Sequence, residues 1–269
     1  MMRIPLQWTI AVTEDEAAMA HKAADVFMET ARDRIKKSGH FSVAVSGGST
    51  PRPMHRLLAE DPHDSSRVWE KTHLFWVDER CVPQDDPASN YGMARGDFVE
   101  AVAIPERQVH PMKGIVEPDR GATDYEKTLR SFFCAKQDAF PRFDLICLGI
   151  GTDGHTASLF PDHPALNETR RWVVAVKGGH PDVWRLTLTL PVLNAARKVM
   201  FLVSGGNKRD VVTKVFQNDP SGLPARRIQP GAGAVTWMLD EDAASGLLWT
   251  RGIEYDHRDE IPAHRCMRR

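Results

Sequence analysis

Short apolar runs alternate with segments of helical periodicity along almost the whole chain. The apolar runs predict buried strands at 7–12, 42–45, 73–77, 143–148, 172–176, 186–190, 199–203 and 235–239. Between most of them the spacing of apolar residues predicts helices, at 51–59, 90–101, 119–133, 191–196 and 207–217. Continuously apolar strands joined by helices are typical of a parallel sheet whose two faces are covered. The pattern therefore predicts an α/β fold with a doubly wound, mostly parallel sheet and helices on both faces, of the Rossmann-like class.

A longer helix is predicted directly after the first strand. Thr13 and Glu16 have the spacing of a capping box, which would begin this helix. Gly39 is expected to end it. Between these limits, apolar residues recur at helical spacing at Ala17, Ala20, Ala24, Phe27, Ala31 and Ile35.

The chain is expected to form a single domain over residues 1–251, because no linker rich in proline, glycine or serine divides it. Residues 252–269 are polar and mixed in charge, with no apolar period, and are expected to form a loosely held C-terminal tail. Ligands of doubly wound folds bind in loops at the carboxyl ends of the strands. The loops that follow the predicted strands are therefore the first place to search for a functional site.

The composition is that of an ordinary soluble globular protein, with 42% hydrophobic and 26% charged residues in 269. The formal net charge of −1 argues against nucleic-acid binding and against electrostatic binding to a membrane. The N-terminal apolar stretch is too short and interrupted for a signal peptide, and no run is long enough to span a bilayer. We therefore expect a cytoplasmic protein, and take a monomer as the expected state.

Cysteines and histidines give no sign of a metal site. The eleven histidines show no paired ligand spacing with acidic residues. The cysteines lack the close spacing of a zinc or redox motif and are expected to be four free thiols, at Cys81, Cys134, Cys147 and Cys266. The sequence therefore requires neither a metal ion nor a cofactor, and the expected partner is a small molecule.

Two loops that follow predicted strands contain Ser-Gly-Gly. The first runs from Ser46 to Pro51, and its glycines allow the backbone to approach a ligand closely. Its amides and hydroxyls precede a helix and favour an anion, although a tight turn without a ligand is the alternative. The second, from Ser204 to Arg209, repeats the pattern and adds the positive charge of Lys208, which suits a phosphate. Two such loops favour a shared phosphate pocket.

A third loop carries the charged residues Asp78, Glu79 and Arg80 at the end of an apolar strand. Ligands of this fold class bind at strand ends, so Arg80 could join the phosphate site and Asp78 could face a sugar hydroxyl. A solvated strand end without a function is the alternative.

The fourth loop, Gly149 to His155, has the G-x-G-x-x-G spacing of a dinucleotide fingerprint. Pro161 leaves little room for the helix that this fingerprint requires, and no acidic residue ends the next strand, so dinucleotide binding is disfavoured. The loop also contains Asp153. A histidine can change its protonation near neutral pH, and a nearby carboxylate can hold the imidazole or help to move a proton. If the other strand-end loops are left aside, a lone histidine in a glycine-rich loop is more often structural than catalytic.

Longer matches resemble the 6-phosphogluconolactonase family. They are V-A-V-S-G-G-S-T-P at 43–51, F-W-V-D-E-R at 75–80, S-N-Y at 89–91, L-G-I-G-T-D-G-H-T-A-S-L-F-P at 148–161, R-L-T-L-T at 185–189 and S-G-G-N-K at 204–208. The run D-G-H-T-A-S-L-F-P is the most specific, and the resemblance covers nearly the whole chain before about residue 252. It implies hydrolysis of 6-phospho-D-glucono-1,5-lactone in the oxidative pentose phosphate pathway. A lactone carbonyl is already electrophilic, so this reaction needs no metal ion or covalent nucleophile.

The resemblance also implies a role for each matched residue. His155 resembles the general base that activates water, and Asp153 resembles its polar neighbour. Asp78 resembles a carboxylate of the pocket, and Arg185 resembles a substrate contact. The phosphate ligands would be Arg80 and Lys208, helped by Gly47, Gly48, Ser49 and Thr50.

Two other functions stay open at this point. The glucosamine-6-phosphate deaminases of the same superfamily share these loops, but they carry a glutamate where this chain has Phe160 and an aromatic residue where it has Arg80. A sugar-phosphate sensor that binds without turnover is the second alternative, although the chain has no length for a separate DNA-binding module. Ammonia release from glucosamine 6-phosphate would support the deaminase, and binding without turnover would support the sensor.

Overall fold

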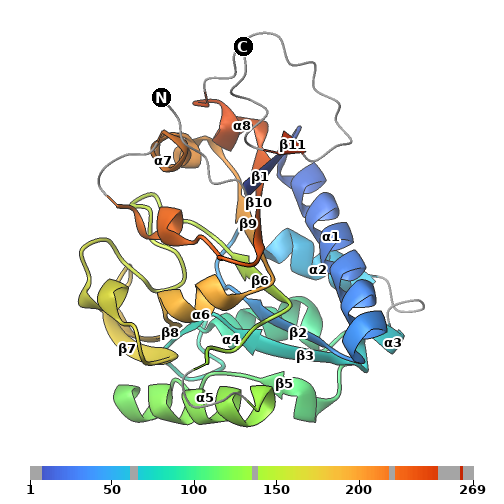
Figure 1. Ribbon diagram of the computed structural model, residues 1–269, viewed down its shortest axis with the longest axis vertical. Coiled ribbons are helices and arrows are strands. Elements are labelled where there is room, and N and C mark those ends of the chain that lie inside the picture. Colours follow the sequence, from blue (N-terminus) through green and yellow to red (C-terminus); the bar gives the residue numbers. More distant parts are fainter. Residues whose placement is uncertain (1–7, 61–65, 135–138, 218–221, 248–260, 263–269) are drawn as a thin grey trace.

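A twisted sheet forms the centre of the molecule (Figure 1). The computed structural model describes residues 8–60, 66–134, 139–217, 222–247 and 261–262. Within them, eight strands are ordered β11-β1-β10-β9-β6-β2-β3-β5, and all neighbours are parallel except β11 and β1. These strands are β1 (Trp8–Thr13), β2 (Phe41–Val45), β3 (Thr72–Trp76), β5 (Val109–His110), β6 (Leu145–Leu148), β9 (Lys198–Val203), β10 (Ala234–Asp240) and β11 (Ile261–Pro262).

The strand order reverses between β2 and β6. After β2 the chain builds outward through β3 to β5, whereas after β6 it builds in the opposite direction through β9 to β10. Such a reversal leaves a crevice outside the carboxyl ends of the two strands, because the loops after them leave toward opposite faces. The Ser46 hydroxyl, just after β2, donates to the Cys147 carbonyl of β6 at 2.8 Å. The topology therefore places the loops that begin at Ser46 and Gly149 side by side.

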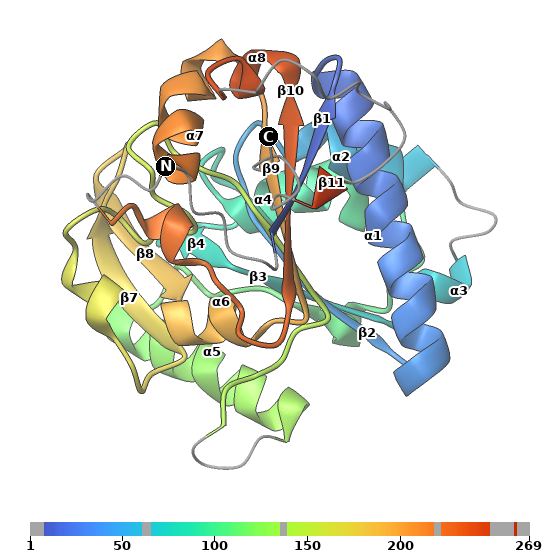
Figure 2. The same cartoon turned by 45° about the horizontal axis from the view of Figure 1, so that its top comes forward.

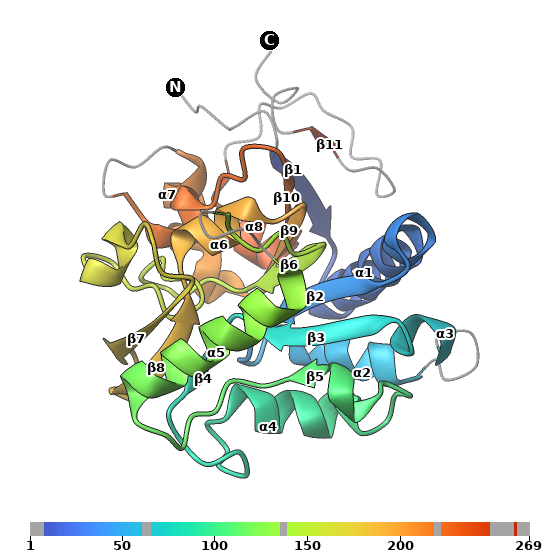
Figure 3. The same ribbon diagram turned by 60° about the horizontal axis from the view of Figure 1, so that its bottom comes forward.

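Helices cover both faces of this sheet, as Figures 2 and 3 show, and the predicted doubly wound fold is confirmed. α1 (Glu16–Ser38) and α2 (Arg52–Glu60) lie on one face, and α6 (Leu190–Ala195) and α7 (Arg209–Phe216) lie on the other. The other helices are α3 (Ser66–Trp69), α4 (Asn90–Ala94), continued by a π-helix (Arg95–Val99), α5 (Pro118–Phe133) and α8 (Glu241–Ala244). Single 3-10 turns lie at Glu106–Gln108, Pro164–Asn167, Gly206–Lys208 and Pro224–Arg227.

A second sheet, which is antiparallel, stands beside the main one. Its order is β4 (Asp78–Arg80), β8 (Val183–Leu188) and β7 (Val173–Gly178), and α5 packs against β7 and β8. The sequence pattern predicts Asp78–Arg80 as a loop, and 172–176 and 186–190 as strands of the main sheet. Apolar strands fit either sheet, so periodicity alone does not distinguish them. Val77 joins the two sheets, because its amide donates to Val45 at 3.0 Å and its carbonyl accepts from Leu188 at 2.8 Å.

The predicted capping box at the start of α1 is wrong. Asp15 is the N-cap, and its carboxylate accepts a hydrogen bond from the Ala18 amide at 2.8 Å. Thr13 does not cap the helix, because β1 extends through it and pairs it with Asp240 of β10. At the other end, Gly39 adopts a left-handed conformation with φ 80°, as expected for the residue that ends the helix.

The hydrophobic core lies between the main sheet and its helices. β2 and β6 are buried along their whole length, as expected for central parallel strands. On the face covered by α7, the rings of Phe201 and Trp237 stack with centroids 3.9 Å apart. Phe216 packs edge-on against Trp237, and Trp8 packs tilted against Trp237 and edge-on against Phe216. Aromatic side chains of this size bury a large apolar area, so the cluster fixes the β1–β10–β9 side of the sheet.

Most of the predicted tail, residues 252–269, lies outside the described residues. Its described part, Ile261–Pro262, pairs antiparallel with Thr9 and Ile10 of β1. The boundary between domain and tail stays a prediction, as does the thiol state of Cys266, while Cys81, Cys134 and Cys147 are free. Within the described residues, no helix is long and apolar enough to cross a membrane.

A buried histidine should make the stability of the fold depend on pH. His55 of α2 is 2% exposed, its Nε2 has no partner among the described residues, and burial lowers its pKa to about 4. An unfolded histidine titrates near pH 6.5, so the unfolded chain binds a proton that the folded chain excludes. The free energy of unfolding should therefore be highest above about pH 6.5 and fall as the pH drops toward about 4.

Urea unfolding of wild type and His55→Phe at about pH 7.5 and about pH 5 measures this contribution. The variant should lose about 2 kcal/mol less than wild type between these two values. His21→Phe is the control, because His21 is an exposed residue of α1, and it should behave as wild type. Equal losses in wild type and His55→Phe would show that His55 does not carry the effect.

Candidate active site

A pocket of about 200 Å³ lies at the crevice between β2 and β6. All the predicted site residues except Asp153 line it: Gly47, Gly48, Ser49, Thr50, Asp78, Arg80, His155, Arg185 and Lys208. They come from the ends of β2 and β6, from β4 and β8 of the second sheet, and from the turn before α7. The two sheets therefore both supply walls to one pocket.

The loop after β2 supplies backbone donors. The amides of Gly47, Gly48 and Ser49 donate to no acceptor among the described residues, and α2 begins at Arg52 just beyond them. Unpaired amides near a helix N-terminus favour a negatively charged group. This wall of the pocket is therefore suited to the oxygen atoms of an anion.

The loop after β6 holds a histidine–aspartate pair. His155 Nδ1 lies 2.6 Å from Asp153 Oδ1, which also accepts a hydrogen bond from the His155 amide at 3.1 Å. Burial would raise the pKa of Asp153, but these two hydrogen bonds outweigh it and hold the pKa below its usual range. An ionised carboxylate can only accept, so the proton of the neutral imidazole is on Nδ1. Nε2 is therefore left as a proton acceptor on a side chain that lines the pocket.

Gly151 makes room for this pair. A Cβ atom at Gly151 would lie 2.1 Å from His155 Nδ1 and 2.5 Å from Asp153 Oδ1, much closer than van der Waals contact. The Gly151 amide donates to the His155 carbonyl at 2.8 Å and closes the turn. Any side chain at this position must displace the imidazole or the carboxylate.

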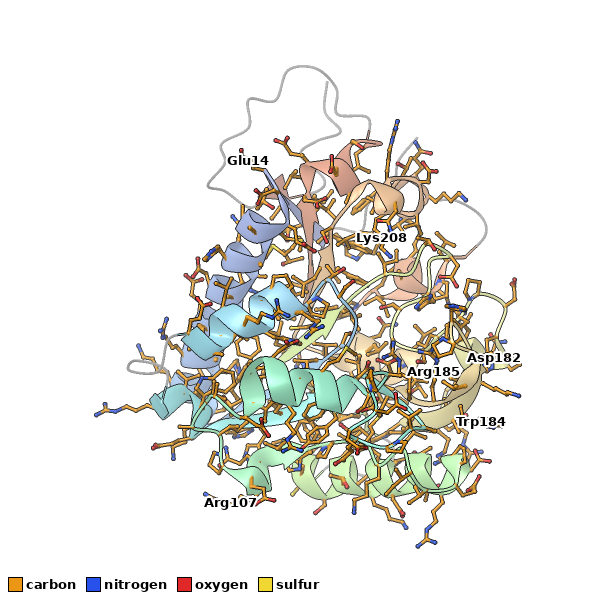
Figure 4. All side chains as sticks on the ribbon, turned by 180° about the vertical axis from the view of Figure 1, so that it is seen from behind. Glu14, Arg107, Asp182, Trp184, Arg185 and Lys208 are labelled. Atoms are coloured by element: carbon orange, nitrogen blue, oxygen red, sulfur yellow. The ribbon has the colours of Figure 1, made fainter. Side chains whose placement is uncertain are left out.

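Three cations from separate elements line the pocket, and Figure 4 shows two of them, Arg185 on β8 and Lys208 before α7. Arg185 points inward, whereas its neighbour Trp184 is 45% exposed, as alternation along a strand requires. Each cation donates to a backbone carbonyl: Arg80 to Ala88 at 2.7 Å, Arg185 to Gly178 at 2.8 Å, and Lys208 to Ile150 at 2.9 Å.

None of these three cations forms an ion pair with a carboxylate of the described residues. Burial lowers the pKa of Arg185, and the nearby charge of Arg80 lowers it further. Burial also lowers the pKa of Lys208, partly offset by the charge of Asp153. Carbonyl hydrogen bonds position the cations without neutralising them, so a bound anion would be their counter-ion.

Asp78 is held at the pocket wall by two residues that were not predicted as site residues, Ser158 and Asn90. Its Oδ2 accepts from the Ser158 hydroxyl at 2.6 Å, and its Oδ1 accepts from the Asn90 side-chain amide at 3.1 Å. Asn90 and Ser158 are 12 and 80 residues away in sequence, so spacing gives no signal for this contact. Their one sequence signal is their place inside the family-matched segments 89–91 and 148–161.

Glu79, between the two pocket residues of β4, has a structural role. Its buried carboxylate accepts from the backbone amides of Arg80, Asn90 and Tyr91 at 2.7–2.8 Å and from the Ser89 hydroxyl at 3.0 Å. Burial raises the pKa of Glu79, and these hydrogen bonds only partly oppose the rise. Glu79 thereby ties β4 to the start of α4, and it does not line the pocket.

The second Ser-Gly-Gly loop is used differently from the first. The Gly205 amide donates to Asp240 at 2.8 Å and the Ser204 hydroxyl donates to Glu16 at 2.7 Å, so both groups are already bound to carboxylates. This loop lines a neighbouring acidic cavity, and only Lys208 reaches the pocket between β2 and β6. The expected shared anion pocket therefore receives amides from one loop and a charge from the other.

Phe160 forms an apolar boundary beside the histidine. Its ring lies 5.0 Å from the His155 ring and 5.6 Å from the Arg185 guanidinium. No α-helix follows the loop after β6, as expected, and the next regular element is the 3-10 turn at Pro164–Asn167. Within the described part of the chain, no three histidine, cysteine or acidic side chains are grouped so as to hold a metal ion.

Comparison with known proteins identifies relatives along most of the chain. The model of the family described as glucosamine-6-phosphate isomerases/6-phosphogluconolactonase matches residues 14–237. A 6-phosphogluconolactonase of Synechocystis sp. is 45% identical over 217 residues, which cover 79% of this chain and 87% of the relative. A second, from Nostoc sp., is 39% identical over 243 residues and covers 89% and 98% of the two chains.

Solved structures agree with these matches. The 6-phosphogluconolactonase from Trypanosoma cruzi superposes with a TM-score of 0.82 at 31% identity, and covers 91% of this chain and 98% of its own. A monomeric glucosamine-6-phosphate deaminase superposes with a TM-score of 0.72 at 20% identity, a likeness of fold alone. From the matched residues, the fold and these relatives together, the chain belongs to the glucosamine-6-phosphate isomerase/6-phosphogluconolactonase family, among its 6-phosphogluconolactonases.

Proposed function

We propose that this chain hydrolyses 6-phospho-D-glucono-1,5-lactone to 6-phospho-D-gluconate in the oxidative pentose phosphate pathway, with His155 as the general base. One observation carries the proposal: three cations that have no carboxylate partner in the described part of the chain line the same pocket as a histidine whose Nδ1 is hydrogen-bonded to a carboxylate. The pocket thus combines an anion-binding wall with a proton acceptor. A cytoplasmic location, as expected from the sequence, is part of this proposal.

Arg80 and Lys208 bind the phosphate in this proposal, together with the amides and hydroxyls of Gly47 to Thr50. The charges are already in place before the substrate arrives, so binding requires little rearrangement. The phosphate is remote from the reacting carbonyl, and its binding orients the lactone ring against His155. Arg185 contributes a third positive charge on the side of the second sheet.

Asp153 prepares His155 for proton transfer. Because it holds the proton on Nδ1, the imidazole presents Nε2 to a water molecule. Nε2 takes a proton from this water as its oxygen attacks the lactone carbonyl carbon. The resulting tetrahedral intermediate breaks the bond between that carbon and the ring oxygen. The imidazolium returns its proton to the ring oxygen, and the acid product then ionises.

Asp153→Asn should lower kcat by roughly 10²–10⁴-fold, with KM almost unchanged. An asparagine amide can donate to Nδ1, which would move the imidazole proton to Nε2 and block the base. His155→Ala should lose kcat to a similar extent and still bind the sugar phosphate. A pH-stat assay on the phosphorylated lactone measures the rates. His21→Ala, which changes an exposed histidine of α1, should leave them unchanged, and normal turnover by His155→Ala would exclude it as the base.

Lys208→Met should reduce the preference for a phosphorylated substrate. We expect the ratio of kcat/KM for 6-phosphogluconolactone over unphosphorylated gluconolactone to fall by roughly 10–100-fold, because a charge-assisted bond to phosphate is lost. The two lactones are compared in one pH-stat series. Lys214→Met, which removes a lysine of α7 outside the pocket, should keep the wild-type ratio. An unchanged ratio in Lys208→Met would remove Lys208 from the phosphate site.

Gly151→Ala should impair activity while the protein stays folded. A Cβ atom there overlaps His155 and Asp153, so kcat should fall by roughly 10²-fold from the displaced base. Gly96→Ala is the matched control, because a Cβ atom at Gly96 meets nothing within 4 Å. Thermal unfolding confirms that both variants fold, and full activity in Gly151→Ala would contradict the assigned geometry.

A further inference from the structure

The pocket carboxylate Asp78 is bound from two sides by side chains of other elements. Ser158 Oγ donates to Oδ2 at 2.6 Å, and Asn90 Nδ2 donates to Oδ1 at 3.1 Å and to the Asp78 carbonyl at 2.9 Å. Asp78 is 5% exposed and lines the pocket. Its two oxygens are therefore fixed in direction, and each keeps a lone pair for a further donor.

Ser158 cannot itself touch a ligand, because it is completely buried. Its amide donates to the Thr187 hydroxyl at 3.2 Å, and Thr187 is the β8 partner of Asp78 in the second sheet. The short hydrogen bond from the Ser158 hydroxyl to the Asp78 carboxylate is charge-assisted, and such bonds are stronger than those between neutral groups. Ser158 thus connects the loop that carries His155 to the carboxylate on β4.

Asn90 is fixed by the loop after β2, which contains Gly47. Its Oδ1 has no hydrogen-bond partner among the described residues, and a Cβ atom at Gly47 would lie 1.8 Å from it. The side-chain amide can occupy this place only because Gly47 has no side chain. Its orientation directs the NH2 group toward Asp78, so the loop after β2 and the carboxylate are set relative to each other.

We propose that Ser158 and Asn90 are positioning residues that aim the Asp78 carboxylate at the ring hydroxyls of the lactone. This inference rests on the proposed function, and it assigns the hydroxyl-recognition element of the same site. The phosphorylated lactone carries free hydroxyls at C2, C3 and C4, which are donors for a fixed acceptor. Cations cannot serve them as acceptors, and among the described pocket side chains Asp78 is the carboxylate.

Deoxy analogues of the substrate test this role. Wild type, Ser158→Ala and Asn90→Ala are assayed by pH-stat with the phosphorylated lactone and with its 2-deoxy, 3-deoxy and 4-deoxy forms. Wild type should lose roughly 10–100-fold in kcat/KM on at least one analogue, because a bond to a carboxylate is missing. On the full substrate, each variant should lose about as much kcat/KM as wild type loses on that analogue, mainly through a higher KM. When the hydroxyl is then removed from the substrate, the kcat/KM of each variant should fall by a further factor of about three or less.

Thr156→Val is the matched control. Thr156 is a buried residue of the same loop, and its hydroxyl donates to the Gly149 carbonyl at 2.8 Å without contacting Asp78. This variant should keep the wild-type penalty for the deoxy analogue, whatever its absolute rate. Thermal unfolding of all variants identifies those that are folded, and either folded variant, Ser158→Ala or Asn90→Ala, is sufficient for the test.

Two outcomes overturn the inference alone: no deoxy penalty in a wild type that hydrolyses the full substrate, or an undiminished penalty in a folded Ser158→Ala or Asn90→Ala variant. A wild type that does not accelerate hydrolysis of the phosphorylated lactone overturns the proposed function as well. The failure of the positioning role and the failure of the function are therefore distinguished in one series of assays.

Discussion

The site depends on cations that are held in place by backbone carbonyls and not by carboxylates. Arg80, Arg185 and Lys208 each donate to a main-chain oxygen, and none forms an ion pair within the described chain. Partly buried charges without counter-ions lower the stability of a fold, as the lowered pKa of Lys208 reflects. In the proposed function this cost has a use, because a carboxylate partner would compete with the substrate phosphate for the cations. The backbone segments around the pocket therefore hold these three charges in place through the carbonyls of Ala88, Gly178 and Ile150.

The two sheets contribute different groups to this arrangement. The main sheet ends in the loops that carry the backbone amides of residues 47–49, His155 and Lys208, whereas the second sheet carries Asp78, Arg80 and Arg185. In the proposed function, the acid–base chemistry lies on the first group of loops and the recognition of the sugar ring lies largely on the second sheet. Reversal of strand order between β2 and β6 opens the crevice in which the two groups meet.

Periodicity and strand-end loops predict six strands of the main sheet, its longer helices and most residues around one pocket, whereas Arg185 is assigned only through the family resemblance. The two-residue strands β5 and β11 are too short to show a pattern. Every predicted strand and helix exists, because continuous apolar runs and helical spacing reflect burial directly. The second sheet is not predicted, since 172–176 and 186–190 are as apolar as strands of the main sheet. The capping box at Thr13 fails because β1 pairs with β10 through Thr13, one residue past the predicted end of the strand, and the helix is capped by Asp15 instead. Local signals therefore succeed where burial decides and fail where pairing decides.

The same limit applies within the site. Asp78 and His155 stand out because they follow apolar strands, whereas Ser158 and Asn90 have ordinary sequence surroundings and act through contacts that only the folded chain creates. The second Ser-Gly-Gly loop matches the first in sequence, yet its amide at Gly205 is bound to Asp240. A motif gives the type of loop, and its neighbours in space decide which of its donors remain available.

Val77 links β3 of the main sheet directly to β4 of the second sheet, and its amide and carbonyl are hydrogen-bonded to Val45 and Leu188, one in each sheet. In the proposed function, the phosphate of the lactone contacts the main-sheet loops together with Arg80, and its ring hydroxyls contact Asp78, so the substrate touches both sheets. The substrate would thus connect the two sheets across the pocket, in addition to the direct chain connection at Val77. Bound substrate would therefore limit any movement of β4 relative to the loops of the main sheet.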